Sequence, residues 1–494
     1  MPYRNQQTFD YEPVLRRGKA DARTDENEFS ESPAFELTEL KFADESPSGE
    51  PLRNKLKPTS QPSTETQSRW RESWIVKRGH ALSYLGIFLF TFVLYFRPYE
   101  LIPALSAFSS MAMVLALMTL GIFIPSQLTL EGNLTARPRE VNLLLLLTVT
   151  ALLSIPMAMS PGEAWATFND TYVKAVIIFI VMVNVVRTEL RLKGLIWLSL
   201  GVGCFVSLNA LDNYRAGNFT VEGYRVEGDL GGLFANPNDM ALHLVTMVPL
   251  AIALLLATRS ISTKLFYAAC ATLMIAGTVV TFSRGGFLGL MAGGFVLAWK
   301  LGRQRRLAVI MVSTVVLVLF LGLAPGNYGG RLSSLFDSNL DKVGSSSARQ
   351  DLLKRSAIVA LRYPLFGVGM GNFHFKSIHE QVSHNAYTQV ASEMGMTALA
   401  LYIMFMVTPL KRLRQIERET SDDQRHDKYY YLSVGVQASL VAYLVDSFFA
   451  SVAYQWYVYY LVAYAICVRR IYDVAEIRAS ENQELTAKDD LARI

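Results

Sequence analysis

Polar side chains of the kinds that move protons or bind phosphate stand out in a sequence otherwise rich in apolar runs. His384 and Asn385 lie side by side in SHNAYTQVASEMG, and Glu393 follows nine residues after the histidine. One imidazole, held in place with a pKa near neutrality, is enough for general base catalysis. We therefore predict that His384 is catalytic and that Glu393 helps to bind substrate. The plainer interpretation of His384 is a hydrogen-bonded loop histidine.

Arginines and helix entries elsewhere in the chain predict a site for an anion. Arg284 lies in TFSRGG between two apolar stretches, where an arginine is costly unless it lines a wet cavity or meets an anion. Arg225 precedes FANPND, where Asn238 belongs to a helix entry whose free N–H groups favour an anion. Arg349 lies on the polar side of an expected amphipathic helix that ends near residue 362. A snorkelling arginine, a capped helix and a solvated face are the plainer interpretations.

The histidines at positions 374, 379 and 384 do not predict a metal site. Their five-residue spacing does not place the side chains on one helical face, and the sequence has no HExxH pattern. The glycines at 367, 369 and 371 lack the Lys-Ser/Thr and the parallel sheet of a phosphate loop. We therefore expect no metal, no cofactor and no nucleic-acid partner.

The predicted residues suggest a division of labour. Arginines would hold a phosphate leaving group and offset its developing charge. The imidazole would deprotonate an incoming hydroxyl. This chemistry needs a phosphate-activated substrate on the outer side of a membrane, which fits a lipid-linked sugar and not a nucleotide sugar made inside the cell.

The elements that must position these residues are membrane helices. The 494 residues are 51% hydrophobic and only 18% charged, against about 25% charged in soluble proteins, and the apolar residues form runs of about 20. An all-α polytopic membrane protein follows, because lipid leaves only helices or closed barrels to satisfy the backbone. About twelve transmembrane helices are predicted, near residues 80–96, 105–124, 141–157, 172–187, 193–210, 239–257, 264–282, 286–300, 307–324, 391–410, 430–448 and 452–468.

Lysine and arginine are concentrated in alternate connections, which predicts that both termini are cytoplasmic. Residues 1–78 read as a disordered cytoplasmic tail, because their composition cannot bury a core. Residues 79–470 would form the membrane domain, and 471–494 a cytoplasmic C-terminal tail. Within the membrane domain, 325–390 is predicted to be a large periplasmic loop that contains amphipathic helices.

Four motifs, taken in order, resemble the O-antigen ligase and polymerase superfamily, and the similarity spans about residues 80–470. They run from Arg225 to Asp239, Thr281 to Gly286, Arg349 to Phe373 and His384 to Gly395. The resemblance implies a metal-independent, inverting glycosyltransferase of the bacterial inner membrane. It would transfer a glycan from undecaprenyl diphosphate to an acceptor on the periplasmic face, either another glycan or a lipid A-core. Lipopolysaccharide and exopolysaccharide synthesis are the pathways implied.

The resemblance also implies roles for individual residues. His384 would activate the acceptor hydroxyl, and Arg225 and Arg284 would lie near the donor diphosphate, with Arg349 as a further candidate. One departure concerns the subtype: ligases tend to have Gly-x-x-Gly after the histidine, where this chain reads Gly-Met-Thr-Ala from Gly395. Ligase, polymerase and protein glycosylation all remain open, and a flippase and a chain-length regulator are partners by analogy alone.

Two other classes of protein remain as alternatives. A secondary transporter, for example of bicarbonate, would keep ionisable groups within its spans, and Asp446 is the clearest charge inside an apolar run. A scaffold of a polysaccharide export complex would need neither His384 nor Arg284. The polar residues gather in the predicted outer loop and not within the spans, which favours the enzyme.

Overall fold

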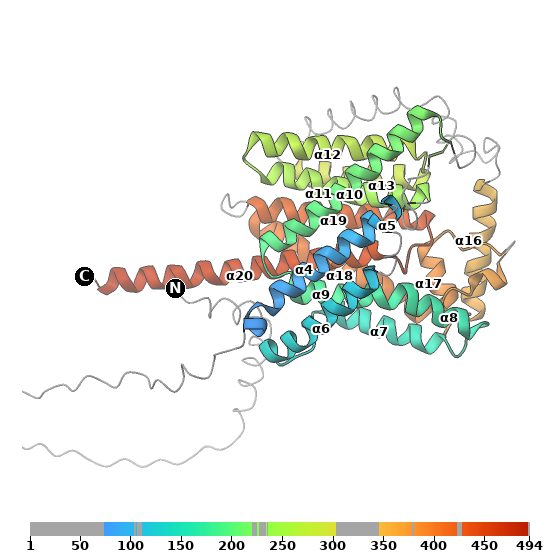
Figure 1. Cartoon of the computed structure of the whole chain (residues 1–494), viewed down its shortest axis with the longest axis horizontal. Helices are drawn as coiled ribbons and strands as arrows, with labels where there is room; N and C mark the ends of the chain where they lie inside the picture. Colours follow the sequence, from blue (N-terminus) through green and yellow to red (C-terminus); the bar gives the residue numbers. More distant parts are fainter. Residues whose placement is uncertain are drawn as a thin grey trace, which may run out of the picture. The chain divides into compact units, whose positions relative to one another are not determined.

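The part of the chain that can be described is helical throughout (Figure 1). The computed structural model describes residues 74–102, 105, 111–219, 225–226, 234, 236–302, 345–377, 380–421 and 427–492, and no β-strand forms among them. The chain divides into two units, Met1–Arg78 and Gly79–Ile494, and the helices that carry the candidate residues lie in the second. Nearly all of the predicted N-terminal tail is outside the described residues.

The helices follow one another with short connections wherever the chain is described. Their bounds are α4 (Trp74–Phe96), α5 (Pro98–Leu101), α6 (Met111–Glu131), α7 (Arg139–Ser154), α8 (Pro161–Thr167), the π-helix η2 (Phe168–Tyr172), α9 (Val173–Val185), α10 (Glu189–Ala216), α11 (Pro237–Ala257), α12 (Ile261–Val280), α13 (Arg284–Leu301), α16 (Ser345–Arg362), the 3-10 helix η5 (Phe373–Lys376), α17 (Ala386–Met394), α18 (Met396–Thr420), α19 (Asp427–Asp446), the 3-10 helix η6 (Ser447–Phe449) and α20 (Trp456–Ala492).

Seven of the described helices are long and apolar enough to cross a membrane. They are Met111–Glu131, Pro161–Val185, Glu189–Ala216, Pro237–Ala257, Ile261–Val280, Met396–Thr420 and Asp427–Phe449. The His80–Phe96 part of α4 is apolar but shorter. Each predicted span overlaps a helix except 307–324, which lies outside the described residues. The all-helical, multi-pass class is therefore confirmed, while the number twelve and the large periplasmic loop stay predictions.

The predicted span at 391–410 is wrong at its start. Gly395, with φ +92°, separates α17 from α18, so the long apolar helix begins only at Met396. A Cβ at position 395 would overlap the backbone carbonyl of Leu365, which is why the break falls on a glycine. The residues from Asn385 to Glu393 consequently belong to a short helix of their own in front of the membrane helix.

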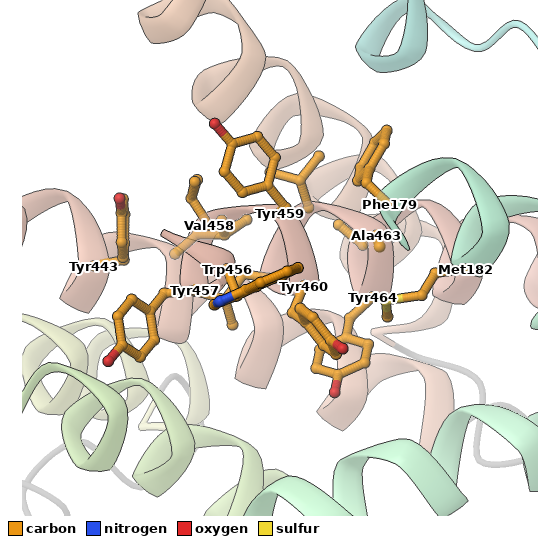
Figure 2. Close-up of a cluster of buried hydrophobic side chains, with 14 of the residues drawn as sticks. Phe179, Met182, Tyr443, Trp456, Tyr457, Val458, Tyr459, Tyr460, Ala463 and Tyr464 are labelled. Atoms are coloured by element: carbon orange, nitrogen blue, oxygen red, sulfur yellow. The ribbon is translucent and has the colours of Figure 1, made fainter. Parts of the chain in front are cut away.

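The first half of α20 forms much of the core of the bundle. Figure 2 shows its aromatic side chains packed among those of α9 and α19. The Tyr460 hydroxyl lies 2.8 Å from Thr91 Oγ1 on α4, and the Tyr464 hydroxyl lies 3.1 Å from Ser199 Oγ on α10. Buried phenols are costly without hydrogen-bond partners, so these contacts let α20 bury tyrosine where the sequence alone suggests only a span.

Glycines let α13 pack tightly between α11 and α19. A Cβ at Gly286 would lie 2.7 Å from the Cβ of Ala241, and a Cβ at Gly289 would lie 3.0 Å from the Cβ of Asp446. Only the missing side chains permit this approach. The packing brings the beginning of α13, where Arg284 lies, against the first turns of α11 and the last turn of α19.

Candidate active site

Arg225 is buried and bound to the beginnings of two helices. Its Nε donates to the carbonyl oxygen of Thr281 at 3.0 Å, and its Nη2 donates to Asn238 Oδ1 at 2.8 Å. Ser283 Oγ donates to the same Asn238 oxygen at 3.1 Å. Asn238 therefore joins Arg225 to the entry of α13, and the Arg225 acceptors in these contacts are neutral oxygens. The predicted helix entry is confirmed, since Asn236 caps α11 by accepting from the Asn238 N–H.

Arg284 is the first residue of α13 and is only 7% exposed. Ser283 caps the helix by accepting from the Gly286 N–H at 3.2 Å. Phe282, just before the cap, has φ +53° and turns the chain sharply between α12 and α13, as the TFSRGG motif predicts. Arg284 therefore belongs to the first turn of α13, whose positive dipole end favours an anion.

Asp446 brings a carboxylate to the Arg284 turn. It ends α19, is 1% exposed, and lies so close to Gly285 that a Cβ there would overlap Asp446 Oδ1. The sequence singles out Asp446 as a charge within an apolar run and links it to transport. The structure instead places it against Gly285, the residue after Arg284.

His384 lies in a strained turn immediately before α17. Its φ is +50°, a left-handed conformation that costs a residue with a side chain about 1–2 kcal/mol, and the ring is half-buried. The flanking residues hold the turn: Ser383 Oγ donates to the Asn385 carbonyl at 3.0 Å and lies 3.2 Å from Ser451 Oγ. The surroundings fix the backbone conformation that presents the imidazole.

Asn385 has two structural roles that the sequence prediction missed. Its Oδ1 caps α17 by accepting from the N–H groups of Tyr387 and Thr388, each at 2.9 Å. Its Nδ2 donates to the carbonyl oxygen of Phe448 at 3.0 Å. An asparagine before a helix signals the cap, but nothing local signals a partner 63 residues away.

The segment around η6 joins the histidine turn to the arginine turn. Phe448 accepts the hydrogen bond from Asn385, and a Cβ at Gly285 would lie 2.9 Å from the Cβ of Phe449. Asn385, the neighbour of His384, contacts Phe448, and Gly285, the neighbour of Arg284, packs against Phe449. The two turns therefore meet at consecutive residues of η6. The structure brings these two predicted residues into one region, and Arg225 reaches it through Asn238 and Ser283.

The environment of His384 keeps its imidazole neutral. Burial, together with the smaller effect of the positive charge of Arg349, lowers the pKa of His384 to about 4. A neutral ring at pH 7 has a lone pair available to accept a proton. Arg349, on α16, thus acts on the predicted histidine, whereas Arg225 and Arg284 lie at the other turn.

The side chain of Glu393 is buried and hydrogen-bonded to other groups of the protein. Its Oε2 accepts from the Gly371 N–H at 2.8 Å and from the Tyr454 hydroxyl at 2.7 Å, and the side chain is 4% exposed. Burial raises the pKa of Glu393 to about 7 against these hydrogen bonds, which lower it. These contacts connect α17 to the glycine turn after α16, so substrate binding by Glu393 remains a prediction.

The predicted histidine cluster is only partly described. His374 Nδ1 lies 2.9 Å from the Gly371 carbonyl oxygen, and its Nε2 lies 3.4 Å from a carboxylate oxygen of Glu163. His379 lies outside the described residues. Within the described ranges, no three or more His, Cys, Asp or Glu side chains are grouped so that they could hold a metal ion.

The region that contains the arginine turn and the histidine turn is similar to a known protein family. Residues 269–403 match the sequence model of a family described as O-antigen ligase. This part of the chain is similar to the O-antigen ligase family. The region matched to the O-antigen ligase family includes Arg284, Arg349, His384 and Glu393, and it excludes Arg225 and Asn238.

Two further comparisons complete these findings. The comparison with curated proteins gives no match. Among solved structures, one similar chain comes from work described as "Structural coordination of polymerization and crosslinking by a peptidoglycan synthase complex". The two chains are 17% identical, the similarity covers 68% of this chain and 97% of the other, and the TM-score is 0.39.

Proposed function

We propose that this protein transfers a glycan from undecaprenyl diphosphate to a hydroxyl of an acceptor at the membrane surface. The observation that carries the proposal is the junction at η6, where Phe448 contacts the histidine turn and Phe449 the arginine turn. A general base and a cationic site for a phosphate leaving group thereby lie on either side of one short segment. The similarity of residues 269–403 to the O-antigen ligase family supports the same class of reaction.

In this mechanism, His384 takes the proton of the acceptor hydroxyl as its oxygen attacks the anomeric carbon of the donor sugar. The new carbon–oxygen bond forms as the bond from that carbon to the diphosphate oxygen breaks. Attack from the face opposite the leaving group inverts the anomeric configuration. Arg284 and Arg225 stabilise the charge that collects on the departing undecaprenyl diphosphate. No step in this scheme calls for a metal ion.

The position of Asp446 bears on the transporter alternative. A coupling carboxylate in a transporter is expected near the middle of a span. Asp446 instead ends α19 and packs against Gly285, beside Arg284. We propose that Asp446 belongs to the transfer site, where its carboxyl group packs against the turn that carries Arg284.

The reaction is tested with purified protein in lipid nanodiscs, an undecaprenyl-diphosphate-linked oligosaccharide, and either a glycan or a lipid A-core acceptor. The expected result is coupled formation of glycosylated acceptor and free undecaprenyl diphosphate, unchanged by EDTA. His384→Gln should abolish both products. Release of undecaprenyl diphosphate by wild type with every acceptor absent would indicate a hydrolase, and loss of activity with EDTA would reopen a metal-dependent scheme.

The orientation is a separate part of the proposal: both termini in the cytoplasm of a bacterium, and the site on the periplasmic face of the inner membrane. A topology reporter fused after residue 335 should be periplasmic, and one fused after residue 420 should be cytoplasmic. If both fusions report the same side, the proposed orientation is wrong. The proposal that the donor lies in the outer leaflet is then wrong as well.

A further inference from the structure

Large apolar side chains remain exposed at the end of the bundle that carries His384. They come from the second half of α16 with its following turn and from the connection between α7 and α8. We call them the apolar patch: Met157 (62% exposed), Met159 (48%), Ile358 (56%), Leu361 (74%), Leu365 (69%) and Phe366 (36%). Single exposed apolar residues are ordinary, but a set of six from adjoining segments indicates a surface that is covered in use.

Two backbone hydrogen bonds connect the segments that carry the apolar patch to the beginnings of two candidate membrane spans. The Met159 N–H donates to the Val368 carbonyl at 3.0 Å, just before the span that begins at Pro161. The Met396 N–H, at the first residue of another span, donates to the Pro364 carbonyl at 2.8 Å. The turn that carries Leu365 and Phe366 therefore lies where two candidate spans begin. If these helices span the bilayer, their beginnings are expected near the boundary between acyl chains and lipid headgroups.

The outward face of α16 changes character along its length. Lys354 and Leu361 are seven residues apart, which places them two turns apart on the same face of the helix. Lys354 and Gln350 make the first half of this face polar, whereas Ile358 and Leu361 make the second half apolar. In Figure 1, α16 runs across the direction of α11 and α12. A helix that crosses the end of a bundle with one apolar half suits a tilted position at a membrane surface.

We propose that the apolar patch is immersed in the acyl-chain boundary of the lipid bilayer, so that the second half of α16 is anchored in lipid while its first half stays in water. Lipid is the occupant that the contacts favour, because the apolar patch continues the lipid-facing surface of the two spans tied to it. Trp165, 54% exposed near the start of one of these spans, is a residue type enriched at that interface. The anchor would set the depth of Arg349, which lies in the aqueous half and influences His384.

The test measures depth by electron paramagnetic resonance on full-length protein in phospholipid nanodiscs. The three native cysteines are replaced by alanine or serine, and single spin labels are placed at Leu361→Cys and, as the matched control, at Lys354→Cys. These positions share one helix face and are similarly exposed. Collision with oxygen, which concentrates in lipid, is compared with collision with a water-soluble nickel chelate.

We expect the label at 361 to collide with oxygen several-fold more than with the chelate, and the label at 354 to show the reverse. Equal access of the chelate to both positions would place the apolar patch in water and overturn the proposal. Shielding of position 361 from both reagents would mean that a partner protein or a second copy covers it, and would also overturn it. The measurement requires no catalysis, so it can fail or succeed independently of the transfer reaction.

Discussion

Asn385 donates a hydrogen bond from Nδ2 to the backbone carbonyl of Phe448 at 3.0 Å, and this single contact connects the histidine turn to the segment that packs on the arginine turn. The same asparagine caps α17 with its Oδ1. A residue beside the candidate base thus fixes both the helix that follows and the position of the whole turn. We infer that the distance between His384 and the donor site depends on Asn385.

Replacing Asn385 by aspartate separates these two roles. Aspartate can still cap α17, but it cannot donate to Phe448 and places its charge against that carbonyl. Transfer should fall about tenfold or more, since about 1.4 kcal/mol of lost positioning corresponds to a factor of ten, while the protein stays folded. Initial rates in nanodiscs and size-exclusion elution in detergent check this. Wild-type rates in Asn385→Asp would show that the Phe448 contact is unimportant.

Arg225 should not tolerate lysine. The guanidinium reaches the Thr281 carbonyl and Asn238 Oδ1 from two different nitrogens, which one ammonium group cannot reproduce. Arg225→Lys is expected to lower transfer by roughly ten- to a hundredfold, on the basis of one or two lost charge-assisted hydrogen bonds. Arg215→Lys, at an exposed position in the last turn of α10, is the control and should be neutral. Equal effects of the two substitutions would argue against the site.

Arg349→Gln should change the pH dependence of transfer in a defined direction. Removing the positive charge makes protonation of His384 easier, so the pKa of His384 rises from about 4 towards its ordinary value of 6.5. Because the neutral ring is the active form, the acidic limb of the pH–rate profile should move to higher pH. Lys354→Gln, on the same helix, should leave the limb in place. An unmoved limb in Arg349→Gln would mean that His384 is not the titrating base.

Glu393 should make stability depend on pH. Its pKa in the folded protein is raised to about 7 from an ordinary value of 4.5, so the folded state keeps a proton that the unfolded state has lost. The stabilisation from this group is fully present below pH 4.5 and is lost as the pH rises through about 7. Glu393→Gln removes the effect, so its thermal unfolding temperature should decline less than that of wild type between pH 5 and 8. Parallel curves for the two proteins would show that Glu393 is ionised throughout.

The parts of the structure that depend on local chemistry are predictable from the sequence. The helix entry at Asn236, the turn before α13 and the end of α16 follow from residue type and periodicity within a few positions. The contact of Asn385 with Phe448 and the packing of Asp446 on Gly285 join segments far apart in the chain. A single sequence carries no signal for such pairs. The break at Gly395 was missed for a related reason, because the backbone of Leu365 that requires a glycine there comes from a distant turn.

The most direct test of the account uses a bacterial host that lacks the gene and displays its surface glycan on a gel. The host is complemented with wild type, His384→Ala, Arg284→Ala and the control Arg215→Ala at matched expression. We expect wild type and the control to restore the glycan, and both other variants to fail and to accumulate undecaprenyl-linked glycan. Single repeat units left on the acceptor would indicate a polymerase, and bare acceptor a ligase. Full restoration by both His384→Ala and Arg284→Ala would contradict the central claim that these two turns form one transfer site.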